Sequence, residues 1–200
     1  MILTSDGASS LVIDRLNRQT PGQNTAVLGL YCDYQTQGEQ SAIDMIGGLL
    51  RQVWGEAGIP GEIRRAFNDS KRSGGRGLRM PGMLKLFIKV ARSIDRVYIC
   101  VDAVDELLPK DRLEFLRGLQ QIIQDAPNTR LFLTTRPSIQ AELVRQLEGA
   151  YVMRIVADQG DIASYLTQKI EDDNAQDPDL MTGDLKNDII RTMLGKASEM

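Results

Sequence analysis

The sequence predicts an α/β fold with a mainly parallel sheet that is covered by helices on both faces. Strand-like apolar segments alternate with amphipathic segments along the chain, an order typical of parallel strands that are connected by helices. The strand candidates are residues 26–32, 97–101, 130–134 and 151–156. The first two are apolar almost throughout, which indicates strands buried on both faces, whereas Arg154 interrupts the last one and places it at a sheet edge.

Segments with helical spacing of apolar residues fill the intervals between these strands. Near the start of the chain, Gly7 lowers helix propensity by roughly 1 kcal/mol, so we expect the first helix to begin near Ala8. Ser41 is a good N-terminal cap for the second helix. The remaining helices are predicted over residues 84–91, 109–123, 137–147, 158–170 and 185–194.

Two stretches look irregular. Residues 68–82 combine several glycines with Pro81 and basic residues, which predicts a flexible insertion. Residues 171–183 are acidic and are expected to link the last two helices. The 200 residues are enough for one α/β domain with a core. We therefore expect a domain over residues 1–170, followed by a linker and the start of a further helical segment over residues 171–200.

The composition excludes several classes of function. A net charge of -3 and a pI of about 5.1 argue against nucleic acid as the main partner, because neutralising phosphates requires a surplus of Lys and Arg. No apolar run approaches the roughly 20 residues of a membrane span, and no secretory signal is visible, so no membrane partner is expected. The chain has no histidine, which excludes His-based triads and His–metal sites. Cys32 and Cys100 lie in apolar segments, as expected of free thiols in the cytoplasm.

The strongest chemical signal is the acidic end of the second strand. Asp102 closes the strand, and Asp105 and Glu106 follow within four residues. Ligands bind at the carboxyl edge of open parallel sheets, where a carboxylate can hold Mg²⁺ while the ion bridges phosphate oxygens. Asp105 and Glu106 are then placed to polarise an attacking water. The competing interpretation is an acidic turn that caps the next helix.

The next strand also ends in polar residues. Thr134, Thr135 and Arg136 close it, and Pro137 follows. The fork of N–H donors on an arginine suits phosphate oxygens, so Arg136 is a candidate to contact a γ-phosphate. Taken alone, this strand end could equally be a capping threonine beside a surface arginine. The two strand ends together predict one site at a shared edge of the sheet.

These motifs resemble a known family. The Val-Asp-Ala-Val-Asp-Glu segment at 101–106 resembles the Walker B box of the NACHT domain of STAND-type P-loop NTPases, and residues 131–137 resemble its sensor 1 strand. Residues 32–34 and 158–166 are similar to stretches of the fungal branch, the nephrocystin-like N-terminal domains. The resemblance extends over nearly the whole chain, and its Walker B and sensor segments are the specific part.

The resemblance implies a role for each motif residue. Asp102 would bind Mg²⁺ and Asp105 or Glu106 would assist hydrolysis. Arg136, with Thr134 and Thr135, would contact the phosphates of ATP or GTP. It also implies a cytoplasmic switch within an NLR-like protein. The expected partners are other NACHT domains or the repeat domains, such as ankyrin repeats, of the full-length protein.

The sequence departs from the family at the phosphate-binding loop. The 200 residues contain no Gly-x-x-x-x-Gly-Lys-[Ser/Thr] string, whose backbone N–H groups and lysine cradle phosphates. The segment 2–16 resembles the helix that follows this loop, so we expect the first, Walker A strand to be missing. The glycine-rich segment 73–77 is a poor substitute, because no strand precedes it.

Because of this departure, two functions are compatible with the sequence. One is a partial nucleotide-binding domain of a signalling ATPase, with weak or no nucleotide binding and little hydrolysis by the chain alone. The other is a non-catalytic scaffold or oligomerisation module derived from such a domain. A missing central strand would expose backbone groups on its neighbours, which predicts self-association. An AAA+ or helicase motor would share the acidic strand and the sensor, but the spacing at 103–106 is closer to NACHT boxes.

Overall fold

The computed structural model describes residues 2–3, 8–54, 61, 79–154, 159–176 and 183–197. The chain divides into two compact units, Met1–Arg154 and Ile155–Met200. The domain boundary predicted after residue 170 stays a prediction, since compactness and evolutionary domains need not divide a chain at the same place. In the described part of the chain, no helix is long and apolar enough to cross a membrane.

A parallel sheet forms the centre of the first unit. Its described strands are β1 (Ile2–Leu3), β2 (Thr25–Tyr31), β3 (Arg96–Asp102) and β4 (Thr129–Thr134), in the order β1-β4-β3-β2. All three pairings are parallel. The α/β class and the first three strand predictions are therefore confirmed, and the buried interior of β3 matches its apolar sequence.

Strand β1 is the unexpected member of this sheet. We expected the first strand to be missing because the segment 2–16 resembles the helix that follows the phosphate-binding loop. That interpretation needs correction at its start, since residues 2 and 3 pair with β4 as a strand and the helix begins at Ala8. Ile2 lies beside Leu133 and Leu3 lies beside Thr134. These two apolar residues thus occupy the position beside the carboxyl end of β4.

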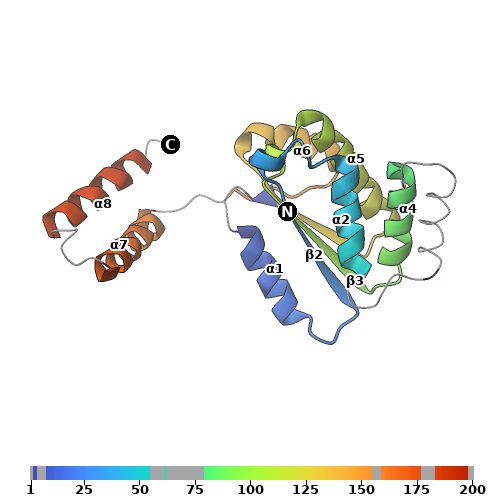
Figure 1. The fold of residues 1–200 in the computed structure, drawn as a ribbon, viewed down its shortest axis with the longest axis horizontal. Coiled ribbons are helices and arrows are strands. Elements are labelled where there is room, and N and C mark those ends of the chain that lie inside the picture. The colour runs from blue at the N-terminus through green and yellow to red at the C-terminus, as the bar shows by residue number, and fades with distance from the viewer. Residues whose placement is uncertain are drawn as a thin grey trace. The chain divides into compact units, whose positions relative to one another are not determined.

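The described helices of this unit pack around the sheet. They are α1 (Ala8–Gln19), α2 (Ala42–Trp54), α4 (Met80–Ala91), α5 (Pro109–Asp125) and α6 (Gln140–Gln146). Figure 1 shows α1 on one face and α2, α4 and α5 together on the other. The first helix begins at Ala8, as the sequence predicted. Parallel strands require such crossover connections, because a tight turn cannot return the chain to the same end of the sheet.

The core lies between the sheet and the layer formed by α2, α4 and α5. Ile46, Phe87, Phe115 and Leu119 are fully buried there, together with Ile99 of β3. Their helical spacing puts one apolar stripe of each helix against the strands. Burying a side chain of this size contributes roughly 1.5–3 kcal/mol, so the layer supplies much of the stability that holds the strand ends in place.

Strand β2 is held along its outer side by a glutamine. The Oε1 of Gln52 accepts a 2.8 Å hydrogen bond from the N–H of Gly29, and its Nε2 donates a 2.8 Å bond to the same residue's carbonyl. A Cβ atom at Gly29 would lie 2.9 Å from Cδ1 of Ile13. Glycine therefore lets α1 approach the strand closely while α2 binds its backbone.

Two sequence predictions need correction in this unit. The strand predicted at 151–156 does not form in its described part, where Val152 makes only an isolated bridge and Tyr151 is 69% exposed. The irregular stretch predicted at 68–82 ends earlier, because Met80 begins α4 with a proline in its first turn; residues 62–78 lie outside the described part. Proline suits that position because it has no N–H to satisfy and its φ is already helical.

The second unit contains two helices that contact each other. Helix α7 spans Gln159–Gln176 and α8 spans Gly183–Ala197. Both were predicted, but the linker predicted from residue 171 is wrong over 171–176, which continue α7. Ile170 is buried, and Nζ of Lys186 lies 3.0 Å from Oε1 of Glu171, so contacts between the helices extend α7 beyond its apolar stripe.

Candidate functional site at the carboxyl edge of the sheet

Three polar side chains meet where β3 and β4 end and α1 begins. Asp102 is the last residue of β3, and its Oδ1 accepts 2.6 Å hydrogen bonds from Oγ of Ser9 and Oγ1 of Thr134. Ser9 and Thr134 are 1% and 3% exposed. Hydroxyl donors at this distance from a carboxylate form strong, charge-assisted bonds. Among the described residues, no donor to Oδ2 of Asp102 is present.

The backbone after Asp102 bends sharply. Ala103 has φ 52° and ψ 49°, and among the described residues it is the only non-glycine residue with positive φ. Its N–H donates a 2.8 Å bond to Oγ1 of Thr134, the same atom that donates to Asp102. A left-handed alanine costs roughly 1–2 kcal/mol. Thr134 therefore stabilises a strained bend that turns the acidic segment out of the sheet.

The predicted acids and arginine lie together just beyond this bend. Asp105 Oδ1 accepts bonds from Oγ1 of Thr135 at 3.2 Å and from the N–H of Arg136 at 3.0 Å. The guanidinium of Arg136 lies 3.6 Å from Oδ2 of Asp105 and 3.6 Å from Oε1 of Glu106. The side chain of Arg136 is 72% exposed, whereas that of Asp105 is 9% exposed. Asp105 is thus held by two hydrogen bonds, whereas most of the Arg136 side chain faces solvent.

The segment that follows β2 reaches the same acidic turn. The N–H of Tyr34 donates a 2.9 Å bond to Oε2 of Glu106, and the N–H of Cys32 donates to the carbonyl of Asp102. Burial, followed by the charges of Asp102, Glu106 and Asp105, raises the pKa of the Cys32 thiol to about 12. Cys32 is a free, buried thiol, as the sequence predicted.

A buried arginine that the sequence analysis did not single out supports the acidic turn. Arg112 donates from Nη1 to the carbonyls of Leu107 at 3.0 Å and Asp105 at 3.4 Å. Its other nitrogens bind both carboxylate oxygens of Glu142 in α6, at 3.1 and 3.0 Å. The signal was present in the sequence, because Arg112 shares the helical spacing of the buried Phe115 and Leu119.

The carboxyl edge offers only a few oxygen atoms of the kind that Mg²⁺ prefers. Among the described residues, no group of three or more His, Cys, Asp or Glu side chains could hold a metal. The carboxylate of Asp102 and the hydroxyl of Ser9 are two hard oxygen ligands. Mg²⁺ commonly takes one or two protein oxygens and completes its shell with phosphate and water.

Solved structures of other proteins share the fold of this chain. The Walker-type ATPase PABY2304 of Pyrococcus abyssi matches with a TM-score of 0.53 and 14% identity, over 96% of this chain and 56% of that chain. Cdc6p of Pyrobaculum aerophilum matches at 0.54 and 15% identity, over 85% and 42%. A chain of the Drosophila ORC bound to DNA matches at 0.54 and 13% identity, over 97% and 49%. The chain spans about half the length of these proteins and has the fold of a P-loop ATPase domain.

Sequence comparison places the chain more narrowly. Residues 8–136 match the family described as Nephrocystin 3, N-terminal. The match covers well over half of the chain, which belongs to this family. No curated protein sequence matches it. The structure brings the six predicted site residues to one edge, but their roles in binding and catalysis stay predictions.

Proposed function

We propose that this chain is a partial NACHT nucleotide-binding domain from a cytoplasmic, NLR-like STAND ATPase. The observation that best supports this is the bond between Ser9 and Asp102. P-loop NTPases hold Mg²⁺ between a serine or threonine at the start of a helix and an aspartate at the end of a strand. The same two residue types meet here, at the corresponding ends of α1 and β3.

The remaining edge residues take roles that follow from their positions. Oδ2 of Asp102 and Oγ of Ser9 would hold a Mg²⁺ ion, which neutralises charge on phosphate oxygens when it is bound. Asp105 and Glu106 would orient an attacking water. Arg136, whose guanidinium is mostly exposed, can leave these acids for a phosphate of ATP or GTP. Thr135 keeps Asp105 in place while the arginine moves.

One residue argues for weak binding by the chain alone. Ala8 stands directly before Ser9, where the phosphate-binding string carries a lysine. A methyl group provides neither charge nor a hydrogen-bond donor, so a large part of the phosphate affinity is absent. This favours the second candidate function, a scaffold or oligomerisation module. Its partners would be other NACHT domains or the repeat domains of a longer protein.

The two functions separate in a loop-replacement experiment. Residues 4–8 are replaced by a Gly-x-x-x-x-Gly-Lys sequence, so that Ser9 directly follows the new lysine. The matched control carries alanine in place of that lysine. Calorimetric titration with Mg²⁺–ATP and Mg²⁺–GTP should give no measurable heat of binding for the natural chain or the control. The lysine variant should bind, and Asp102→Asn in that background should remove the dependence on Mg²⁺.

Each result decides between the proposals. If the lysine variant folds and still does not bind, the edge is not a nucleotide site, and the scaffold function is favoured. If the natural chain binds Mg²⁺–ATP tightly, the expectation of weak binding is wrong and the phosphate ligands lie elsewhere. Thermal unfolding of all the variants verifies that each one is folded.

A further inference from the structure

Strand β2 lies at one edge of the described sheet, with β3 as its neighbour on the inner side. The N–H of Cys32, directly after β2, donates to the carbonyl of Asp102 in β3, so the even-numbered residues direct their backbone groups toward β3. Because this direction alternates along a strand, Val27, Gly29 and Tyr31 direct their N–H and C=O groups to the outer side. This outer row is the part of the sheet to which a further strand would bind.

Two glutamine side chains bind this outer row. Oε1 of Gln52 accepts a 2.8 Å bond from the N–H of Gly29, and Nε2 of Gln52 donates a 2.8 Å bond to the carbonyl of the same residue. Nε2 of Gln40 donates a longer, 3.4 Å bond to the carbonyl of Tyr31. Two residues that exchange both bonds in this way form the hydrogen-bonded pair of an antiparallel ladder. The amide of Gln52 therefore occupies the place of a residue from an antiparallel strand.

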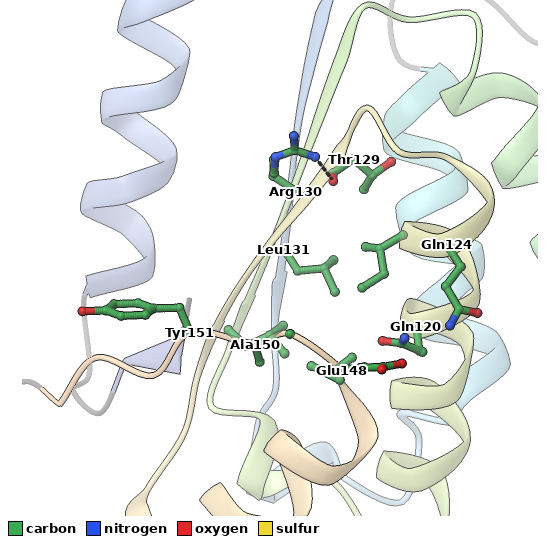
Figure 2. A pocket seen from close by; sticks show the side chains of 12 residues that line it. Gln120, Gln124, Thr129, Arg130, Leu131, Glu148, Ala150 and Tyr151 are labelled. Carbon is green, nitrogen blue, oxygen red and sulfur yellow. Dashed lines mark hydrogen bonds between the residues drawn. The ribbon is translucent and has the colours of Figure 1, made fainter.

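Strand β4 is protected in a different way where the described residues of β1 do not reach it. Arg130 lies in this part of the strand. Figure 2 shows its guanidinium beside Thr129, whose carbonyl it binds at 2.9 Å. Charged side chains and prolines commonly protect sheet edges, because an open row of N–H and C=O groups pairs with other chains. β2 has neither in its sequence, TAVLGLY, so the amide of Gln52 takes this protective role at Gly29.

The sequence around Gly29 is complementary to itself. Val27 and Tyr31 lie two residues before and after it, and Tyr31 is 56% exposed. If a second β2 runs antiparallel and is centred on Gly29, each Val27 lies opposite the Tyr31 of the other copy. Pairs of a β-branched and an aromatic residue stabilise such ladders. The strand that fits this edge is therefore the same strand of another copy.

We propose that Gln52 blocks antiparallel pairing of β2 with the β2 strand of a second copy of this chain. When its side chain leaves Gly29, the edge becomes a symmetric dimer interface, in which Gly29 of each copy makes the two bonds that Gln52 made. This device goes beyond nucleotide binding and does not depend on it. It also lies on the edge strand opposite to β1, away from the position of the missing strand.

Sedimentation velocity of the 200-residue chain over a range of concentrations tests the block. Gln52→Ala should raise the association constant for dimer formation about fivefold or more over that of the natural chain. The reason is that pairing no longer has to break two hydrogen bonds. Gln121→Ala is the matched control, since Gln121 is an exposed glutamine of another helix, α5, and it should leave association unchanged. Gln52→Leu removes the same two bonds with less loss of side-chain volume, and it replaces Gln52→Ala if thermal unfolding shows that the alanine variant is not folded.

Two further measurements test whether the dimer forms through β2. Tyr31→Lys in the Gln52→Ala background should return association to that of the natural chain, because it places a charge on the paired edge. Amide hydrogen exchange at Gly29, followed by NMR, should be slow in the natural chain and fast in dilute Gln52→Ala. It should become slow again as the concentration of this variant rises.

Three results overturn the proposal. The first is equal association of the natural chain and the Gln52 variants. The second is stronger association that Tyr31→Lys leaves intact, which assigns the dimer to another surface. The third is rapid exchange of the Gly29 amide in the natural chain, which shows that Gln52 does not hold the strand in solution.

Discussion

Oγ of Ser9 donates a 2.6 Å hydrogen bond to Oδ1 of Asp102, which lies 93 positions later in the sequence. The bond joins the first turn of α1 to the end of β3. Thr134 donates to the same oxygen, so two hydroxyl groups hold the strand end from both sides. Because Ser9 is almost fully buried, water cannot replace its hydroxyl, and the carboxylate is positioned before any ligand arrives.

This bond gives the first prediction. Ser9→Ala should lower the free energy of unfolding by roughly 1–3 kcal/mol, because it removes a buried donor to a charged group. Urea denaturation measures the loss. Ser138→Ala is the matched control, since Ser138 is exposed and such changes stay within about 0.5 kcal/mol. If both variants are equally stable, the bond does not fix the strand end.

The buried pair of Arg112 and Glu142 gives the second prediction. Arg112→Ala should lower the free energy of unfolding by roughly 2–4 kcal/mol, because it leaves Glu142 and two backbone carbonyls without their donor. Hydrogen exchange should also rise at the amides of the acidic turn, which separates a positioning role from a general loss of stability. As a control, Arg191→Ala breaks an ion pair whose side chains are 84% and 74% exposed, and it should change little.

The third prediction concerns Arg136. Arg136→Ala should change the free energy of unfolding by less than about 1 kcal/mol, because its side chain is exposed and its ion pairs are 3.6 Å long. The same substitution in the lysine-loop variant should weaken Mg²⁺–ATP binding, as measured by calorimetry. A large loss of stability with unchanged nucleotide binding would instead give this arginine a purely structural role.

The fourth prediction is a dependence of stability on pH. The pKa of Cys32 is raised from 9.0 to about 12, so the folded chain holds the thiol proton more tightly than the unfolded chain. The resulting stabilisation is complete below about pH 9 and is lost as the pH rises toward 12. Cys32→Ala should therefore reduce the fall in urea midpoint between about pH 8 and pH 11. If the urea midpoint falls equally in the natural chain and in the variant, the folded chain does not hold this proton more tightly.

Cys100 is the internal control for the source of that shift. Burial alone raises its pKa to about 11, whereas three carboxylates add to the effect at Cys32. Glu106→Gln should therefore lower the pKa of Cys32 and leave that of Cys100 unchanged. Alkylation of the two thiols by iodoacetamide, followed by mass spectrometry, compares them within one molecule.

The periodicity of apolar residues was sufficient to predict the elements whose burial can be inferred from their own sequence. β2, β3 and β4 were found because their apolar runs are buried on both faces, and α1 was found to begin at Ala8 because glycine disfavours the preceding turn. The strand predicted at 151–156 was wrong over its described part, residues 151–154, because β-propensity does not supply a neighbouring strand, and Tyr151 and Met153 remain exposed. Pairing partners are a property of the whole sheet.

The candidate site was predictable in part for a related reason. Residues at strand ends can be assigned to one edge from the parallel topology alone, which placed Asp102 and Arg136 correctly. Ser9 and Arg112 were not predicted as site residues, because their carboxylate partners lie on elements distant in the sequence. A serine at the start of a helix is ordinarily interpreted as a local cap. An arginine among the apolar residues of a helix is ordinarily interpreted as an exception to the apolar pattern.

The left-handed backbone at Ala103 also limits how this turn can vary by mutation. Single-nucleotide changes convert an alanine codon to valine or threonine, whose branched side chains are poorly compatible with a φ of 52°. A change to glycine is equally accessible in the genetic code and relieves the strain. Natural variants at position 103 should therefore be small residues. Most other single-nucleotide substitutions at this position should be removed by selection because they impair folding, whatever their effect on activity.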